Sequence, residues 1–445
     1  MHPSRRSFLR QLAAGAVVAP WVTRGLRAQS PNSIVHHASF GAAGMAKSDY
    51  TAITKHPAVK LVAACDVDLK RTEEFRKLFP EARVYRDFRE LLEKEKDLQT
   101  ANVSTPDHMH APIGIAAMQR GLHVYGQKPL TYSLHESRRM AEIAAEKKLV
   151  TQMGIQVHSS TEYRTAVQLV QSGAIGKVKS VHTWSSKAWG DSVPKPDRVD
   201  AVPEGLDWDL WLGVAADRPF IGDRWYHPGN WRKRVDFGTG TFGDMGCHIY
   251  DPVFKALALT SPLRVRSEGA APNEHSWAMD AVIHYVFPGT AYTEGATVEV
   301  IWYDGKQRPP AEIQKLALDP ALAADDKANK VPDQGSIFLG TEGVMVLPHV
   351  GMPRLLGGAK REVQPVEGGN HWFEFIDAAL GKGRTSAHFG YAGPLTEAVL
   401  LGSVASRFPK QTLEWNAAAL KFTNVAEANR YVKRDYRAGW DIAGL

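Results

Sequence analysis

The stretch that decides the fold is Ile34-Val35-His36-His37-Ala38-Ser39-Phe40-Gly41-Ala42-Ala43-Gly44-Met45-Ala46, an apolar run that leads through a glycine-containing turn into a helical pattern. A dinucleotide-binding turn of the form G-x-G-x-x-G uses one glycine for the bend, one for close approach of a pyrophosphate and one for helix packing. The chain has alanine, the smallest substitute, at the second and third of these positions, with Gly44 between them. The stretch therefore predicts a strand, a phosphate-binding turn and a helix.

Outward from this stretch, residues 33–156 alternate short apolar runs with helical patterns, which is typical of βαβ units on a parallel sheet. Strands are predicted at Ile34–Phe40, Val59–Cys65, Ala101–Thr105, Leu122–Tyr125 and Leu149–Gly154. Helices are predicted at Met45–Lys55, Leu69–Leu78, Pro112–Arg120 and Leu134–Lys147, the last opened by Ser133 and Glu136 at the spacing of a capping box. We expect a doubly wound Rossmann domain over residues 33–156.

Side chains that could hold a dinucleotide follow several of these strands. Asp66 ends the second strand, where a carboxylate accepts hydrogen bonds from the adenosine ribose and repels a 2′-phosphate, so the sequence favours NAD over NADP. The candidate cofactor residues are Gly41, Ala43, Gly44, Met45, Asp66, Thr105, Pro106, His108, His110, Gln127, Lys128 and Gln156. The alternative is an α/β domain with a small-residue turn, ordinary loops and a solvated lysine.

From Val157 the pattern changes to one helix and a series of strands separated by long polar connections. The helix is predicted at Glu162–Ser172, and the strands at Val178–Trp184, Ala278–Phe287, Thr297–Tyr303, Ser336–Gly340 and Val344–Leu347. Helices at Leu395–Arg407 and Val425–Val432 close the chain. Residues 157–445 are therefore predicted to form an α/β domain with a large, mostly antiparallel sheet, which binds the substrate and joins subunits.

A glycine-rich segment ahead of Pro252 carries Asp244 and His248, four residues apart and so on one face of a predicted helix. A carboxylate beside an imidazole orients it and raises its basicity, which suits a general base. The alternatives are a capping aspartate beside a core histidine, a metal site with His227 or Asp251, and a purely structural turn. Since neither H-E-x-x-H nor a cysteine cluster is present, no metal is predicted.

Six of the twelve tryptophans fall between Trp184 and Trp231, among hydrogen-bonding side chains. Aromatic rings beside polar groups suit a carbohydrate, although Trp208 and Trp211 are expected in the core. The candidate substrate residues are His158, Tyr226, His227 and Arg232.

Several motifs resemble the Gfo/Idh/MocA oxidoreductase family, in its exported branch. They are T-P-x-x-x-H at residues 105–110, Gln127-Lys128-Pro129 in place of E-K-P, W-D-L-W-L-G at residues 208–213 and G-D-M-x-C-H at residues 243–248. The resemblance implies a catalytic trio facing a nicotinamide, in which Lys128 hydrogen-bonds the reacting hydroxyl, His248 is the acid/base and Asp244 supports both. Gln127 departs from the motif, since it removes a carboxylate that could position Lys128.

The N-terminus, residues 1–28, reads as a twin-arginine export signal. Ser4-Arg5-Arg6-Ser7-Phe8-Leu9-Arg10 precedes an apolar run from Leu12 to Val22 that is too short to span a bilayer, with a cleavage point at Ala28. We expect a periplasmic or otherwise exported protein without stable membrane insertion; an ordinary secretory signal is the alternative. The formal charge of +6 includes five leader arginines, so the remainder is near neutral and gives no reason to expect nucleic acid.

Export and a nicotinamide cofactor together constrain the reaction, because a free NAD pool is not expected outside the cytoplasm. We expect an NAD-dependent oxidoreductase acting on a CH–OH group of a sugar, sugar derivative or glycoside, with tightly bound NAD(H) recycled within each cycle. The alternatives are a plain NAD-dependent sugar or inositol dehydrogenase and an exported, non-catalytic sugar-binding protein. An exposed sheet face would favour a homo-oligomer, a dimer or a tetramer.

Overall fold

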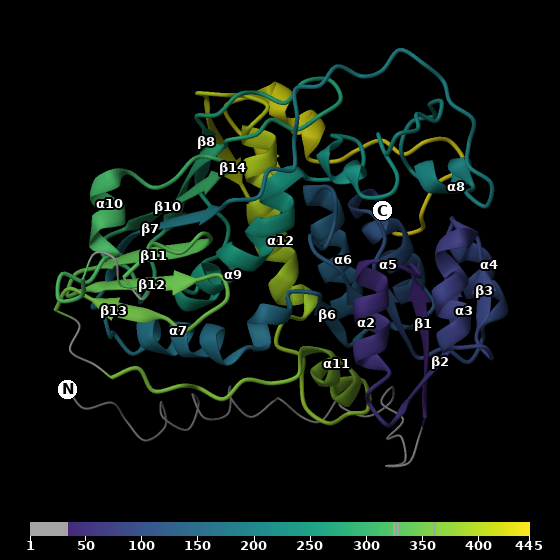
Figure 1. The fold of residues 1–445 in the computed structure, drawn as a ribbon, viewed down its shortest axis with the longest axis horizontal. Helices are drawn as coiled ribbons and strands as arrows, with labels where there is room; N and C mark the ends of the chain where they lie inside the picture. The colour runs from purple at the N-terminus through teal and green to yellow at the C-terminus, as the bar shows by residue number, and fades with distance from the viewer. Residues whose placement is uncertain (1–33, 324–325, 327–328, 359–361) are drawn as a thin grey trace, which may run out of the picture.

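The computed structural model describes residues 34–323, 326, 329–358 and 362–445 (Figure 1). The predicted export signal at residues 1–28 lies outside these residues.

The first domain is built on a six-stranded sheet in the order β3-β2-β1-β4-β5-β6, with every neighbouring pair parallel. The strands are β1 (Val35–Phe40), β2 (Val59–Cys65), β3 (Arg83–Tyr85), β4 (Thr100–Val103), β5 (His123–Gly126) and β6 (Thr151–Met153). The helices are α2 (Met45–Ile53), α3 (Glu73–Leu78), α4 (Phe88–Lys94), α5 (His110–Gln119) and α6 (Leu134–Glu146). The prediction of a Rossmann domain is confirmed, since this strand order is that of a doubly wound dinucleotide-binding sheet.

Burial explains which of these elements were predicted. β4 is buried along its whole length, as a parallel strand covered on both faces should be, although Thr100 and Asn102 are polar. α6 begins at a complete capping box, in which Ser133 and Glu136 each bond the other's backbone amide. β3 was missed because it is a three-residue edge strand with an exposed first residue, and the seven-residue helix α4 was missed as well.

The second domain carries a nine-stranded sheet in the order β13-β12-β11-β7-β10-β9-β8-β14-β15. The strands are β7 (Val178–Ser185), β8 (Arg264–Ser267), β9 (Val282–Pro288), β10 (Thr297–Asp304), β11 (Gly335–Gly340), β12 (Val344–Pro348), β13 (Arg354–Leu356), β14 (Thr412–Asn416) and β15 (Lys421–Phe422). Only the β7–β10 pair is parallel among the described pairs, which confirms a mostly antiparallel sheet. The helices are α7 (Thr161–Gln171), α8 (Trp208–Leu212), α9 (Cys247–Ala256), α10 (Ala311–Leu316), α11 (His371–Ala379) and α12 (Phe389–Ala405), and residues 426–431, predicted as a helix, form a 3₁₀ turn.

Helix α12 joins the two halves of the molecule and crosses the centre of the view between them (Figure 1). Leu395, Val399 and Leu401 are fully buried, and the helix packs on α6 of the first domain and on α9 and β8 of the second. An ion pair between Arg138 on α6 and Glu397, 2.8 Å apart, adds a polar contact along the same seam. The two domains therefore share one apolar core.

A long connection, residues 186–238, leaves the second sheet and returns over the first domain, where α8 lies (Figure 1). Leu206 forms an antiparallel bridge with Asp68, which follows β2. Trp211 and Phe237 pack together, with ring centroids 4.7 Å apart, in an aromatic cluster under this connection. The connection thereby covers the carboxyl edge of the parallel sheet. In the part of the chain that the structure describes, no helix is long and apolar enough to cross a membrane.

Buried histidines make the stability of this fold depend on pH. His37 on β1 is fully buried between Thr100 and Asn102, and burial lowers its pKa to about 4. Between about pH 4 and the ordinary value of 6.5 the unfolded chain binds the extra proton, so the free energy of unfolding falls as the pH falls through this window.

We expect His37→Gln to flatten this dependence, by up to about 1.4 kcal/mol per pH unit, in urea unfolding measured between pH 7 and pH 4.5. The same slope in both proteins would contradict the assignment of the buried, neutral imidazole.

Candidate active site

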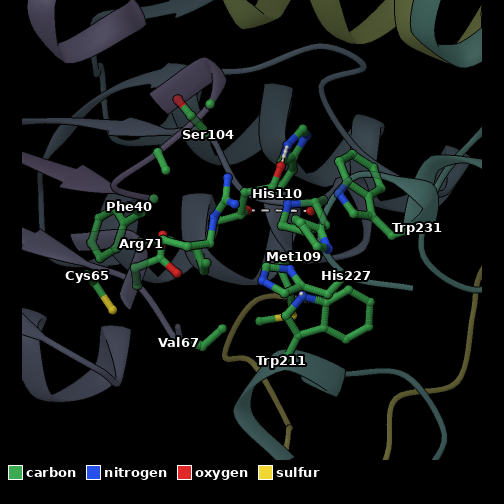
Figure 2. Close-up of a pocket in the computed structure, with 18 of the residues that line it drawn as sticks. Phe40, Cys65, Val67, Arg71, Ser104, Met109, His110, Trp211, His227 and Trp231 are labelled. Atoms are coloured by element: carbon green, nitrogen blue, oxygen red, sulfur yellow. Dashed lines mark hydrogen bonds between the residues drawn. The ribbon is translucent and has the colours of Figure 1, made fainter. Parts of the chain in front are cut away.

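A cavity of about 500 Å³ opens at the carboxyl edge of the parallel sheet. Its walls come from the turns after β1, β2, β4 and β5 and from the long connection, which contributes Trp211, His227, Trp231 and Arg232. Figure 2 shows Phe40, Cys65 and Ser104 on one side of this cavity, with Trp211, His227 and Trp231 on the other. Ligands of open α/β sheets bind at this edge.

The turn after β1 leaves room for a pyrophosphate. Gly41 and Gly44 have φ angles of 102° and 60°, which favour glycine, and a Cβ at Gly41 would lie 2.7 Å from the carbonyl oxygen of Ser104. Gly44 at the N-cap of α2 has no side chain that could cap the helix, and Gly41, Ala43, Gly44 and Met45 all line the cavity. The first amides of this helix are therefore available to an anion.

Asp66 also lines the cavity and is held by the backbone. Its carboxylate accepts hydrogen bonds from the amides of Ala42 and Asp68, each at 3.0 Å, and burial raises its pKa. Both oxygens retain a lone pair, which fits the hydroxyls of an adenosine ribose. The glycine turn, the uncapped helix and this carboxylate together fit a dinucleotide.

Lys128 follows β5 and meets Asp244 of the second domain. Its ammonium lies 2.5 Å from Oδ1 of Asp244 and 3.3 Å from the backbone oxygen of the same residue. The two side chains are only 13% and 10% exposed, so the ion pair is nearly shielded from water. The structure thus brings together these two members of the predicted catalytic trio at the seam between the domains.

Asp244 is surrounded by donors. Its other oxygen accepts a hydrogen bond from Nε1 of Trp189 at 2.7 Å, and Arg232 lies 3.2 Å from Oδ1. Burial alone would raise the pKa of this carboxyl, but the charges of Arg232 and Lys128 outweigh burial and hold the pKa well below its usual value. Asp244 therefore stays a carboxylate.

Asp244 lies in the π-helical segment of residues 242–246, and His248 lies in the first turn of α9, which follows it. Among the described residues no hydrogen bond joins the two; the ring of His248 packs against His349, with centroids 5.6 Å apart, in a neighbouring cavity of about 70 Å³. Burial, followed by the charge of Lys128, lowers the pKa of His248 well below 6.5. The expectation of a more basic imidazole is therefore wrong in direction, because burial and the charge of Lys128 favour the neutral form of His248.

Other predicted cofactor residues divide between the cavity and the core. Thr105, Pro106, His110 and Gln127 line the cavity, and the nitrogens of His110 lie 2.7 and 2.8 Å from the carbonyl oxygens of Pro129 and Thr105, bracing the two loops. His108 does not line it, because its buried ring packs on Phe237 and donates to the carbonyl oxygen of Trp211. Gln156 lies in a 3₁₀ turn away from this lining.

The predicted substrate residues divide in the same way. Arg232 and His227 line the cavity; Nε1 of Trp211 donates to Nδ1 of His227, so its Nε2 donates to Asp68 at 2.9 Å. Tyr226 is buried in the aromatic cluster. His158 is buried beside Asp251, 2.8 Å from its carboxylate, and is absent from the cavity lining. No group of three metal-binding side chains is found among the residues described.

Two family profiles match the chain. One describes an oxidoreductase family with an NAD-binding Rossmann fold and matches residues 36–155; the other describes the C-terminal alpha/beta domain of the same family and matches residues 160–313. The chain belongs to the Gfo/Idh/MocA oxidoreductase family. The dinucleotide that its first domain fits is therefore NAD.

Individual relatives of this Gfo/Idh/MocA chain include levoglucosan dehydrogenase of Pseudarthrobacter phenanthrenivorans, 24% identical over 37% of this chain and 34% of the relative. Inositol 2-dehydrogenase of Salmonella typhimurium is 27% identical over 35% of this chain and 47% of the relative. The matches thus span between a third and a half of these relatives. The WlbA dehydrogenase of Bordetella pertussis, solved with NADH and UDP-GlcNAcA, has a TM-score of 0.60 at 15% identity, covering 86% of this chain and 99% of that one, which shows a shared fold.

Some residues of the site were not predicted. Arg71 and Arg86 line the cavity at the Asp66 end, and the buried Nε of Arg86 has no partner among the described residues. Asp107 accepts hydrogen bonds from Thr239 and lies 3.3 Å from Arg232, and His349 packs on His248. Asp107 stands within the predicted loop, whereas Arg71, Arg86 and His349 carry no sequence signal beyond residue type.

We expect Asp66→Ser to shift cofactor preference toward NADP by about tenfold or more, because it removes the carboxylate that accepts the ribose hydroxyls and leaves Arg71 and Arg86 beside the position of a 2′-phosphate. Isothermal titration with NAD⁺ and NADP⁺ measures the ratio.

Asp87→Asn is the matched control, because it removes one charge from the same cavity while keeping a side chain that caps α4. An equal shift in both variants would show that net charge, not the position of Asp66, sets the preference.

Proposed function

We propose that this protein is an NAD-dependent oxidoreductase acting on a CH–OH group of a sugar, sugar derivative or glycoside. The observation that carries the proposal is the shielded Lys128–Asp244 pair on the seam beside a cavity that fits NAD. Dehydrogenases of levoglucosan and inositol among its relatives support a polyhydroxylated substrate.

Lys128, Asp244 and His248 have different roles in the proposed reaction. Lys128, held by Asp244, donates a hydrogen bond to the oxygen of the reacting hydroxyl, and the neutral imidazole of His248 is ready to accept its proton. Asp244 is fixed by Trp189 and Arg232 and keeps the ammonium in place. NAD, when bound, supplies the hydride acceptor and can return the hydride.

The aromatic side chains beside the pair suit a sugar ring. The guanidinium of Arg232 stacks on Trp231 at 4.4 Å and lies 6.0 Å from Trp189, so two indoles flank the polar centre. Indoles pack on the C–H faces of a sugar while its hydroxyls meet polar groups. The substrate enters between these rings and Lys128.

The proposal extends to location and to the fate of the hydride. The twin-arginine pattern at residues 1–28 supports export to the periplasm, where no NAD pool is expected. We therefore propose that NAD(H) is loaded before export and kept bound, with the hydride returned within each cycle so that glycoside cleavage, epimerisation or paired oxidation and reduction becomes redox-neutral. A dimer or tetramer through the second domain is part of the same proposal.

Mass spectrometry of the denatured protein, purified from the periplasm after expression with its leader, tests the proposal. Near-stoichiometric NAD(H), with turnover of glycosides in the absence of added cofactor, is the expected result. Protein that is empty but oxidises sugars with added NAD⁺ would favour a plain dehydrogenase. Protein that neither carries nor binds NAD would leave a sugar-binding protein.

We expect the acid limb of the kcat/KM profile to lie below pH 6.5, because burial lowers the pKa of His248 and the imidazole stays a base into mildly acidic solution. His248→Gln removes this limb and lowers kcat about a hundredfold or more. A limb at or above pH 6.5 would contradict the neutral, buried imidazole.

A further inference from the structure

A second carboxylate lies behind the cofactor cavity and has no part in the reaction described above. Asp49 on α2 is fully buried. Its Oδ2 accepts hydrogen bonds from Oγ of Ser104 at 2.8 Å and from Nε2 of Gln127 at 2.9 Å, and its Oδ1 accepts one from Nε1 of Trp372 at 3.1 Å. Three donors from three different segments thus converge on one carboxylate.

Two of these donors belong to the loops that line the cavity, one after β4 and one after β5. Both polar atoms of the Gln127 side chain form hydrogen bonds: Nε2 donates to Asp49, and Oε1 accepts from the backbone amide of Lys128 at 3.2 Å. The amide of Gln127 also packs directly against the backbone of Gly154, so closely that a Cβ at that position would lie 2.5 Å from Nε2 of Gln127. This close packing restricts rotation of the Gln127 side chain. Asp49 therefore fixes Gln127, and Gln127 fixes the backbone at Lys128.

The third donor links this carboxylate to the second half of the chain. Trp372 lies on α11, which packs on α2. A buried carboxylate with three donors is stable only while all three segments stay in register, since each lost hydrogen bond leaves a charge less solvated.

Residue 127, the hydrogen-bond partner of Asp49, differs from the family motif. The family motif that the sequence resembles has glutamate before the lysine, whereas this chain has the neutral amide of Gln127. A negative charge is nevertheless present next to residue 127, because the carboxylate of Asp49 accepts a hydrogen bond from the side-chain amide of Gln127. Burial raises the pKa of Asp49 to about 6, and the hydrogen bonds from Trp372, Ser104 and Gln127 oppose this rise, so the group is ionised in mildly alkaline solution.

We propose that Asp49 is a positioning residue for Lys128 and for the two cofactor-facing loops, and that the Asp49–Gln127 pair places on α2 the negative charge that this chain lacks at position 127. The assignment rests on the proposed function in one respect, namely that these loops hold NAD. It makes positions 49 and 127 exchangeable as a pair but not singly.

Binding of NAD⁺ by isothermal titration at about pH 8, where ionised carboxylates persist, tests the pair without a known substrate. We expect Asp49→Asn and Gln127→Glu each to weaken binding by about tenfold or more: the first removes the carboxylate acceptor, and the second sets two carboxylates in contact. In the double variant the new amide at position 49 donates to the new carboxylate at position 127, so the dissociation constant returns to within about threefold of that of the wild type.

The pH dependence of the single variant Gln127→Glu separates positioning from general damage. Two touching carboxylates share a proton once the solution is acidic enough, so NAD⁺ binding by this variant recovers as the pH falls from about 8 to about 6. A variant that was merely misfolded would not recover. If Asp49→Asn does not fold, the recovery of NAD⁺ binding by Gln127→Glu at lower pH is the deciding measurement. No recovery would overturn the proposal.

Asp304→Asn is the matched control. Asp304 is also a buried carboxylate with a tryptophan donor, accepting from Nε1 of Trp302 at 3.1 Å and from the amide of Ala281 at 2.8 Å, but it lies in the second sheet. We expect a lower Tm without weaker NAD⁺ binding. Unchanged binding in Asp49→Asn, or a double variant no better than its worse single variant, would overturn the positioning role. Wild-type protein that binds no NAD⁺ would overturn the proposed function and this role with it.

Discussion

The ion pair between Lys128 and Asp244 is the constraint on which the rest of the structure depends. Each partner comes from a different domain, and both are nearly shielded from water. Removing one partner of a buried ion pair costs about 3–5 kcal/mol, which is an upper figure here because Arg232 also contacts Asp244. The apolar contacts of α12 with α6 and α9 hold the domains at the distance that this pair requires.

Charges alternate outward from this pair. Asp244 contacts Lys128 and Arg232, Arg232 contacts Asp107, and Asp107 accepts from Thr239 at the start of the segment that carries Asp244. Asp244 and Arg232 of the second domain thus each form an ion pair with a residue of the first domain, Lys128 and Asp107 respectively. His248 stays neutral in this surrounding because burial and the nearby ammonium both oppose its protonation. A fixed ammonium beside a neutral imidazole is the arrangement that proton removal from a hydroxyl needs.

Sequence reasoning found elements whose signal is local. β2 was predicted because it is apolar apart from Lys60, and Lys128 and Asp244 because glycine and proline mark the turns that carry them. It missed β8, β13, β14 and β15, which are two to five residues long. It placed His158 and Tyr226 at the substrate because polar core residues and ligand-binding residues share residue types. Asp49 had no local signal, since its partners Gln127 and Trp372 are 78 and 323 residues away.

A crystal structure of the protein with NAD⁺ would show whether the cavity and the Lys128–Asp244 pair form one site. We expect the adenosine ribose on Asp66, the pyrophosphate on the amides that begin α2, and the nicotinamide beside Lys128. A cofactor bound with its nicotinamide away from Lys128, or outside this cavity, would contradict this expectation.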